Sequence, residues 1–270
     1  MGMNGTFTTM KRLCILLLLC MNGALGFTQT VQGFVASTFV NEKSDTLLYQ
    51  LLTPLPKRDK ERYPLVLFLH GAGERGNDNA KQLTHGSSLF LRDEIRKTFP
   101  AYVVFPQCPE EDYWASVAID RSTLPLQLDF DYTRPLTKSL QLAMELVDTL
   151  IKTEQVDVTR IYIVGLSMGG MGTFEAAYHY SYLFAAAIPM CGGGDTTSYA
   201  NKKPVMPFWV FHGSADNVVE VKHSRHMVET IKGFSSLIKY TEYPGVGHNS
   251  WDYAFTEPDL LAWLFSQKRN

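Results

Sequence analysis

Short runs of β-branched and aromatic residues alternate along the chain with longer segments in which apolar residues recur every three or four positions. Runs of the first kind predict strands at Asp45–Pro54, Tyr63–His70, Ala101–Pro106, Arg160–Gly165, Leu183–Met190, Pro207–Gly213 and Ser236–Pro244. Segments of the second kind predict helices at Thr133–Gln155, Met171–Tyr180, around Val219–Ile231 and at Glu257–Gln267. Strands that alternate with helices favour an α/β fold, in which helices cover a mostly parallel sheet.

The connection from Gln107 to Tyr132 departs from this alternation. It joins a strand to a helix, has no clear periodicity and is too long for a simple turn. Long connections in compact domains are usually binding loops or lids, and we expect the same here. No polar linker interrupts the rest of the pattern, so residues 27–270 are expected to form a single domain.

The first 26 residues have the order of a secretory signal peptide. Lys11 and Arg12 precede the apolar run Leu13–Met21, and Ala24–Gly26 supplies small residues before a cut at Phe27. The apolar run is too short to span a bilayer, and no later segment predicts a membrane span. We therefore expect cleavage near Gly26 and a secreted or periplasmic protein. In the alternative, Cys20 becomes a lipidated N-terminus, but Leu19 is bulky where such a site requires a small residue.

Composition narrows the possible partners. The 270 residues are 45% hydrophobic and 19% charged, with a formal net charge of −2 and no Lys/Arg cluster, which argues against nucleic acid and anionic membranes as partners. Removal of the signal leaves Cys108 and Cys191, which export would allow to form a disulfide. They fit two small buried hydrophobes equally well. Neither has a second Cys or His at ligand spacing, so no metal site is predicted.

The stretch "VGLSMGG" has the pattern of a nucleophile elbow. Ser167 follows a buried-type strand and precedes a helix, and Gly165 and Gly169 are small where the strained turn leaves no room. A serine that merely caps a helix would not require glycines on both sides. The backbone N–H of Met168, at the start of the helix, is a candidate oxyanion donor.

A serine hydroxyl needs a base, and downstream motifs supply one together with an acid. Asp216 in "FHGSADNVV" follows a strand, and His248 in "YPGVGHNSW" lies in a loop between the last strand and the closing helix. The order Ser, Asp, His is that of α/β-hydrolases. Asp195 is a rival acid, but it lies one strand too early. His212 ends a strand, where a histidine commonly hydrogen-bonds to backbone.

An early glycine-rich loop and two tryptophans complete the predicted site. In "LHGAGERG" the glycines let backbone approach a substrate, and the N–H of Ala72 is the candidate second oxyanion donor. Glu74 and Arg75 either pair to brace this loop or form a solvated surface pair. Trp114, in the long connection, and Trp251, beyond His248, are candidate walls of a substrate pocket; packing in the core is the alternative for both.

Together these four motifs resemble the α/β-hydrolase family of serine hydrolases, and in particular its secreted carboxylesterases. That group includes feruloyl and acetyl-xylan esterases, polyhydroxybutyrate depolymerase-like enzymes and the phospholipase/carboxylesterase group. The resemblance extends from about Asp45 to the C-terminus. It implies an eight-stranded, mostly parallel sheet with helices on both faces, catalysis without a cofactor, and a triad of Ser167, Asp216 and His248. The sequence shows no helical cap insert of the size found in lipases, and we expect no second binding domain.

The predicted function is an exported serine carboxylesterase that acts on acyl esters of carbohydrates or comparable small esters. A serine peptidase of the prolyl-oligopeptidase kind shares the fold and triad order, but this chain lacks room for the gating domain of such enzymes. A non-catalytic binding protein on the same scaffold is a third possibility, and the complete set of motifs argues against it.

Overall fold

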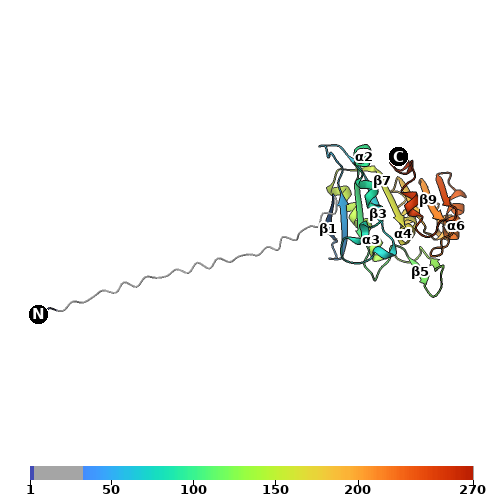
Figure 1. Cartoon of the computed structure of the whole chain (residues 1–270), viewed down its shortest axis with the longest axis horizontal. Coiled ribbons are helices and arrows are strands. Elements are labelled where there is room, and N and C mark those ends of the chain that lie inside the picture. The colour runs from blue at the N-terminus through green and yellow to red at the C-terminus, as the bar shows by residue number, and fades with distance from the viewer. Residues whose placement is uncertain (3–32, 270) are drawn as a thin grey trace.

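The computed structural model describes residues 1–2 and 33–269, so the predicted signal segment lies outside the described residues except for its first two. Eight strands form one sheet in the order β1-β2-β4-β3-β7-β8-β9-β10 (Figure 1). The strands are β1 (Phe34–Val40), β2 (Thr46–Leu52), β3 (Tyr63–Leu69), β4 (Tyr102–Gln107), β7 (Val156–Leu166), β8 (Ala186–Met190), β9 (Phe208–Gly213) and β10 (Ile238–Tyr243). From β4 to β10 all neighbouring strands pair in parallel. β2 pairs antiparallel with both of its neighbours, β1 and β4. This confirms the predicted α/β-hydrolase fold.

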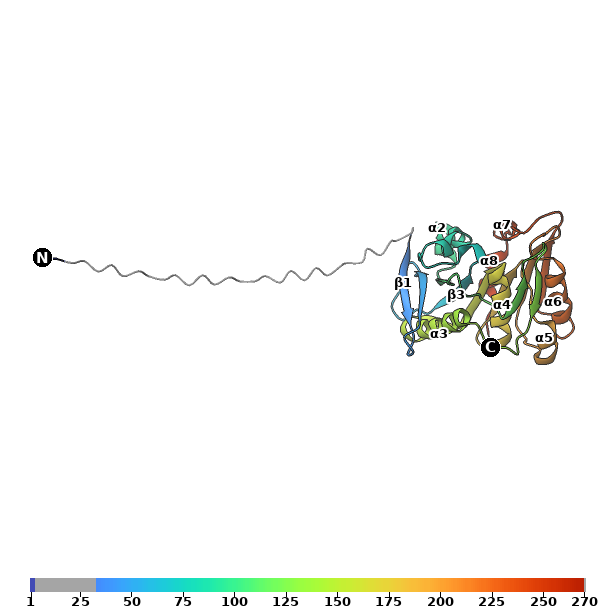
Figure 2. The same ribbon diagram turned by 90° about the horizontal axis from the view of Figure 1, so that it is seen from below.

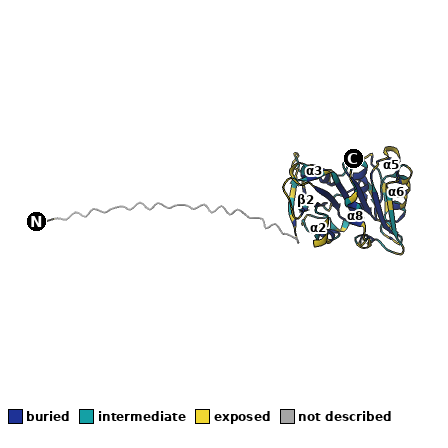
Figure 3. Cartoon of the chain, turned by 90° about the horizontal axis from the view of Figure 1, so that it is seen from above, coloured by how far each residue is buried: buried dark blue, intermediate teal, exposed yellow. Residues whose placement is uncertain are grey.

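Alternation along the central strands divides the core into two layers. In β3, Leu65, Leu67 and Leu69 face one hydrophobic cluster while Val66 and Phe68 face the other. The first cluster is covered by α3 (Lys138–Thr153), α4 (Met168–His179), α5 (Thr196–Lys202) and α6 (Lys222–Lys232). The second is covered by α1 (Ser87–Leu91), α2 (Asp93–Thr98), α7 (Trp251–Ala254) and α8 (Leu260–Ser266). Figure 2 shows α2 and α3 on opposite sides of the sheet, and Figure 3 shows the buried strands between them.

The elements that the sequence pattern did not predict lie at the periphery of the fold. The edge strand β1 is only partly buried, so its apolar positions are interrupted by exposed ones. The helices α1, α2, α5 and α7 are four to seven residues long, so that few apolar repeats could indicate them.

The long connection contains a hairpin, which corrects its description as a loop without periodicity. β5 (Val117–Asp120) and β6 (Gln127–Phe130) pair antiparallel as a separate two-stranded sheet, and β5 is labelled at the lower edge of the domain in Figure 1. The N–H of Leu126 donates to the carbonyl of Val218 (2.9 Å), which ties the hairpin to the segment that carries Asp216.

The structure also bears on the possible disulfide and on membrane spans. Cys108 and Cys191 are free and buried, so the structure favours two buried thiols over a disulfide. Among the described helices, none is long and apolar enough to cross a membrane.

Candidate active site

Ser167 occupies a strained turn between β7 and α4. Its φ of 54° and ψ of −118° lie in a region that non-glycine residues rarely adopt. A Cβ atom added at Gly165 would lie less than 3.0 Å from the carbonyl of Gly169, and one added at Gly169 would lie equally close to the carbonyl of Leu69. The glycines on both sides of Ser167 are therefore required by close backbone contacts, and the turn presents the serine side chain at the end of the strand.

The structure brings Ser167, His248 and Asp216 into one hydrogen-bonded chain. Ser167 Oγ lies 2.9 Å from His248 Nε2, and His248 Nδ1 lies 2.7 Å from Asp216 Oδ2. The histidine side chain is 19% exposed and the aspartate side chain is fully buried. Because the carboxylate can only accept a hydrogen bond, His248 Nδ1 carries the ring hydrogen and donates it to Asp216. Nε2 then has a free lone pair and can accept the serine proton.

The Asp216 carboxylate is held in its charged form by four donors. Oδ1 accepts from the N–H groups of Val218 (2.9 Å) and Val219 (3.0 Å), and Oδ2 faces His248 and His212. Burial alone would raise the pKa of Asp216, but hydrogen bonds from His212, His248 and backbone hold it well below its usual range. The carboxylate therefore stays ionised at neutral pH.

Two loops that carry the acid and the histidine are bonded directly to each other. The N–H of Ala215 donates to the carbonyl of Val246 (2.9 Å), the N–H of Ser214 donates to the carbonyl of Tyr243 (3.0 Å), and the N–H of Gly245 donates to Ser214 Oγ (2.8 Å). These bonds fix the position of His248 relative to Asp216 without any contribution from the serine.

The predicted oxyanion loop lies against Ser167. A Cβ added at Gly71 would be 3.7 Å from the Cβ of Ser167, and Ala72 begins the short 3₁₀ helix η1 (Ala72–Glu74) directly after it. Met168 is the first residue of α4, where N–H groups lack intrahelical partners. Both predicted donors thus lie beside the serine in the chain or in space, and their role stays a prediction.

Arg75 connects this loop to the long connection, a role that neither sequence interpretation gave it. Its guanidinium donates to the carbonyls of Ala72 (3.1 Å), Glu110 (2.7 Å) and Asp112 (3.2 Å). Glu74 instead lies 3.6 Å from the ring of His85. The expected Glu74–Arg75 pair is therefore corrected: each residue contacts a different segment.

The two tryptophans occupy different environments. Trp114 is fully buried, and its Cβ fills the space that a side chain at Gly172 would need. Of the two roles left open for Trp114, burial favours packing in the core over a pocket wall, because its side chain does not reach solvent. Trp251 is 9% exposed, and its ring centre lies 5.3 Å from those of His248 and His85. Its proximity to the histidine agrees with the prediction, whereas contact with a substrate stays a prediction.

Other candidates in the sequence have separate structural roles. Asp195 caps α5 by accepting from the N–H (3.0 Å) and hydroxyl (2.6 Å) of Ser198. His212 does bond to backbone, at the carbonyl of Val219, but it also contacts Asp216. The sequence interpretation missed this second contact, although the spacing of His212 and Asp216 within one motif was a usable signal.

One set of described side chains has ligands close enough for a metal ion. Donor atoms of Cys191, Asp216 and His248 lie within 4.8 Å of one another. Burial raises the pKa of the Cys191 thiol, and the aspartate and histidine atoms already bond to each other, so an ion could bind only by breaking that bond. This set fits a hydrogen-bonded network better than a resident metal.

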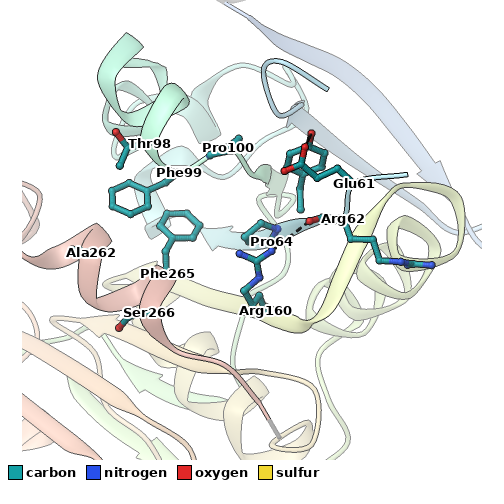
Figure 4. A pocket seen from close by; sticks show the side chains of 11 residues that line it. Glu61, Arg62, Pro64, Thr98, Phe99, Pro100, Arg160, Ala262, Phe265 and Ser266 are labelled. Atoms are coloured by element: carbon teal, nitrogen blue, oxygen red, sulfur yellow. Dashed lines mark hydrogen bonds between the residues drawn. The ribbon is translucent and has the colours of Figure 1, made fainter. Parts of the chain in front are cut away.

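Two surface hollows lie away from the triad. One, of about 310 Å³, is lined by residues at the start of β3 and by the stacked rings of Phe99 and Phe265 (Figure 4). Another, of about 740 Å³, lies between α3 and the turn around Tyr180. Neither includes Ser167, Asp216 or His248, so size alone does not locate the site.

An eight-stranded sheet with a serine at a strained strand–helix turn, bonded to a histidine, defines a serine hydrolase of the α/β-hydrolase class. The chain belongs to the phospholipase/carboxylesterase family, whose sequence profile matches residues 55–257. This confirms both the resemblance and the prediction of an ester hydrolase.

Comparisons with individual proteins agree with this placement. The crystal structure of a thermostable esterase superposes with a TM-score of 0.79 at 35% identity, covering 88% of this chain and 64% of that one. An acyl-protein thioesterase 1 from Neurospora crassa is 26% identical over 212 residues, which cover 68% of this chain and 80% of the thioesterase. A bifunctional acetylxylan esterase/xylanase from Neocallimastix patriciarum is 31% identical over 83 residues, which cover 31% of this chain and 12% of that enzyme.

Proposed function

We propose that the protein is an exported serine carboxylesterase in which Ser167 is the nucleophile, His248 the general base and Asp216 the acid that orients it. The observation that carries this proposal is the continuous chain of two hydrogen bonds, 2.9 Å from Ser167 to His248 and 2.7 Å from His248 to Asp216. Each distance lies within the range needed for direct proton transfer or for orientation of the ring.

The reaction proceeds in two halves. Ser167 Oγ attacks the ester carbonyl while His248 Nε2 takes its proton, and Asp216 stabilises the imidazolium that results. The imidazolium then gives the proton to the departing alcohol, and an acyl-serine remains. Water repeats the sequence in reverse: it loses a proton to His248, attacks the acyl carbon and releases the acid with return of the proton to Ser167 Oγ.

The negative charge that develops on the carbonyl oxygen needs donors in fixed positions. We assign this role to the backbone N–H groups of Met168 and Ala72, because α4 begins beside Ser167 and the loop at Gly71 lies against it. Loss of one such donor typically lowers kcat by about 100- to 1,000-fold. A side-chain substitution cannot remove a backbone N–H. Variants that test these donors must therefore change the conformation of the loop that carries them.

The substrates we propose are acyl esters linked to carbohydrates or comparable small esters. Support comes from the likeness to the bifunctional acetylxylan esterase/xylanase and from the signal-like residues 1–26, which favour an extracellular or periplasmic location. We further propose that residues 27–270 act as one domain without a cofactor, and that Trp251 contacts the acyl or alcohol group.

Ser167→Ala is the direct test. We expect complete loss of turnover and of fluorophosphonate labelling, with a thermal midpoint close to that of the unchanged protein, because the alanine removes only one partly buried hydroxyl and its bond to His248. Ser122→Ala, at an exposed position in the β5–β6 connection, is the matched control and should keep full activity. Labelling of the Ser167→Ala variant would refute the assignment.

An ester panel tests the substrate class. Acetyl, butyryl and feruloyl esters, each with a simple and a sugar alcohol, are compared by kcat/KM, and a peptide anilide is included as the peptidase control. Higher kcat/KM for the sugar esters supports the proposal. Faster cleavage of the anilide than of any ester would favour the peptidase instead.

A further inference from the structure

His212 is the second histidine of this site. It is the penultimate residue of β9 and is fully buried. Its Nε2 lies 3.1 Å from Asp216 Oδ2 and 2.8 Å from the carbonyl oxygen of Val219. Its Nδ1 lies 2.7 Å from Ser224 Oγ, on α6. The imidazole is therefore bonded at both nitrogens and connects the triad carboxylate to a helix on the neighbouring layer.

Hydrogen counting fixes one proton on this ring. Nε2 lies between a carboxylate oxygen and a carbonyl oxygen, and neither atom has a hydrogen to give, so Nε2 must carry the proton. The Ser224 hydroxyl has a single hydrogen, which can go to His212 Nδ1 or to the carbonyl of Gly192, 3.0 Å away. The first choice leaves His212 neutral and the second makes it a cation, but both direct an N–H at Asp216.

We propose that His212 is a positioning residue: its Nε2–H fixes Asp216 Oδ2, the same oxygen that binds His248 Nδ1, so that the two imidazoles share the charge of one carboxylate oxygen. The inference rests on the roles proposed for Ser167, His248 and Asp216. Because both imidazoles bind the same oxygen atom, charge drawn toward His212 is charge that cannot stabilise the imidazolium of His248.

Other ionisable groups surround His212 but do not replace its contact. Cys191, directly after β8, has its sulfur within 4.8 Å of a carboxylate oxygen of Asp216, and burial raises the pKa of its thiol, so it stays neutral. Glu242 is opposite His212 on β10, where Arg225 neutralises it through two hydrogen bonds. Burial lowers the pKa of His223, on α6, to about 4. These groups are neutral or paired near pH 7, so the shared aspartate oxygen is the local determinant.

Two amide variants separate positioning from packing. Glutamine at 212 places its amide nitrogen near the position of Nε2, whereas asparagine reaches only the position of Nδ1. We expect His212→Asn to lower kcat for a p-nitrophenyl ester by roughly 10- to 100-fold, the effect of losing one hydrogen bond to a charged group. The acidic limb of its kcat/KM–pH profile should move to higher pH, because Asp216 then stabilises the His248 imidazolium more strongly.

His212→Gln should restore kcat to within about 3-fold of the unchanged enzyme and should return the limb toward its original pH. Ser224→Ala is the second control: it removes the partner of Nδ1 but leaves the Nε2 contact, and it should leave the limb in place. A wild-type limb and kcat in folded His212→Asn would overturn the inference. Equal losses in both amide variants without a shift of the limb would also overturn it, since they indicate packing alone.

Nitrogen NMR on the full chain provides a test that does not depend on the folding of His212→Asn. With ¹⁵N-labelled histidine and assignment by His212→Gln, Nε2 of His212 should carry a proton throughout the neutral pH range, because both of its partners can only accept. An unprotonated Nε2 in this range would overturn the inference. Failure of the unchanged protein to react at Ser167 would instead refute the proposed function, while the protonation of His212 would remain measurable.

Discussion

Gly169 shows how strictly single positions constrain the turn at Ser167. We expect Gly169→Ala to lower the free energy of unfolding by about 3 kcal/mol or more, because the added carbon would meet the backbone carbonyls of Leu69 and His70, which cannot move aside as a side chain can. Fluorophosphonate labelling should also be lost. Urea unfolding measures the first effect. Gly73→Ala is the matched control, because no atom lies within 4 Å of its added carbon. An equal loss of stability in the two variants would contradict the prediction.

Glu175 is a buried carboxyl group on α4 that no sequence motif revealed. Its Oε2 accepts from the N–H of Ser116 at 2.5 Å, and its Oε1 has no partner. Burial raises the pKa of Glu175 to about 7 from an ordinary value of 4.5. The protonated form therefore favours the folded state, and its contribution to stability is lost as pH rises through about 7.

We expect Glu175→Gln to remove this pH dependence, since the amide has the same shape and no charge. Between about pH 4.5 and about pH 8, the unchanged protein should lose about 3 kcal/mol of stability relative to the variant. Urea unfolding of both proteins at the two pH values measures the difference. Parallel pH profiles would show that Glu175 does not change its protonation in this range.

Motifs were informative at the residue scale where chemistry dictates spacing. The glycines around Ser167 and the order of Asp216 and His248 are properties of the sequence itself, and the structure brings these residues together. The sequence left two roles open for Trp114, because a tryptophan in an irregular segment looks the same whether it faces solvent or packs against Gly172. That distinction depends on tertiary packing.

At the scale of elements, Arg75 joins two loops that the sequence treats as independent. Its three carbonyl contacts span the loop at Ala72 and the segment Glu110–Asp112. We expect Arg75→Lys to lower kcat/KM by about 10-fold, because an ammonium group cannot reproduce this fork and the oxyanion loop would shift. Steady-state kinetics and the thermal midpoint measure the effect. Arg134→Lys, which alters a half-exposed ion pair with Asp131, should change neither.

The more deeply an element is buried, the more clearly the sequence predicted it. β3 and β4 are buried at every position, so their continuous apolar runs were recognisable. β1 has a single buried position and the β5–β6 hairpin has none, so contacts with neighbouring segments, such as the bond from Leu126 to Val218, hold them in place. Such contacts are not visible in a local pattern.

The thiols of Cys108 and Cys191 are buried in the folded domain, so their reactivity reports on unfolding. Cys108 and Cys191 are fully buried, and burial raises the pKa of Cys108 to about 12, so neither forms the reactive thiolate at neutral pH. In a chain that starts at Phe27, we expect no reaction with a disulfide reagent in native buffer and two reactive thiols in denaturant. Reaction followed by absorbance gives the opening rate. Fast labelling of one thiol in native buffer would contradict global protection.

The bonds between the loops after β9 and β10 have an energetic consequence for the proposed reaction. The imidazole of His248 changes between neutral and charged in each half of the cycle, and in bulk water such a change would force nearby solvent dipoles to turn. Here the Asp216 carboxylate and the N–H groups of Val218 and Val219 already point in the required directions. The reorganisation free energy of each proton transfer is thereby reduced before substrate arrives, because folding has already oriented the dipoles.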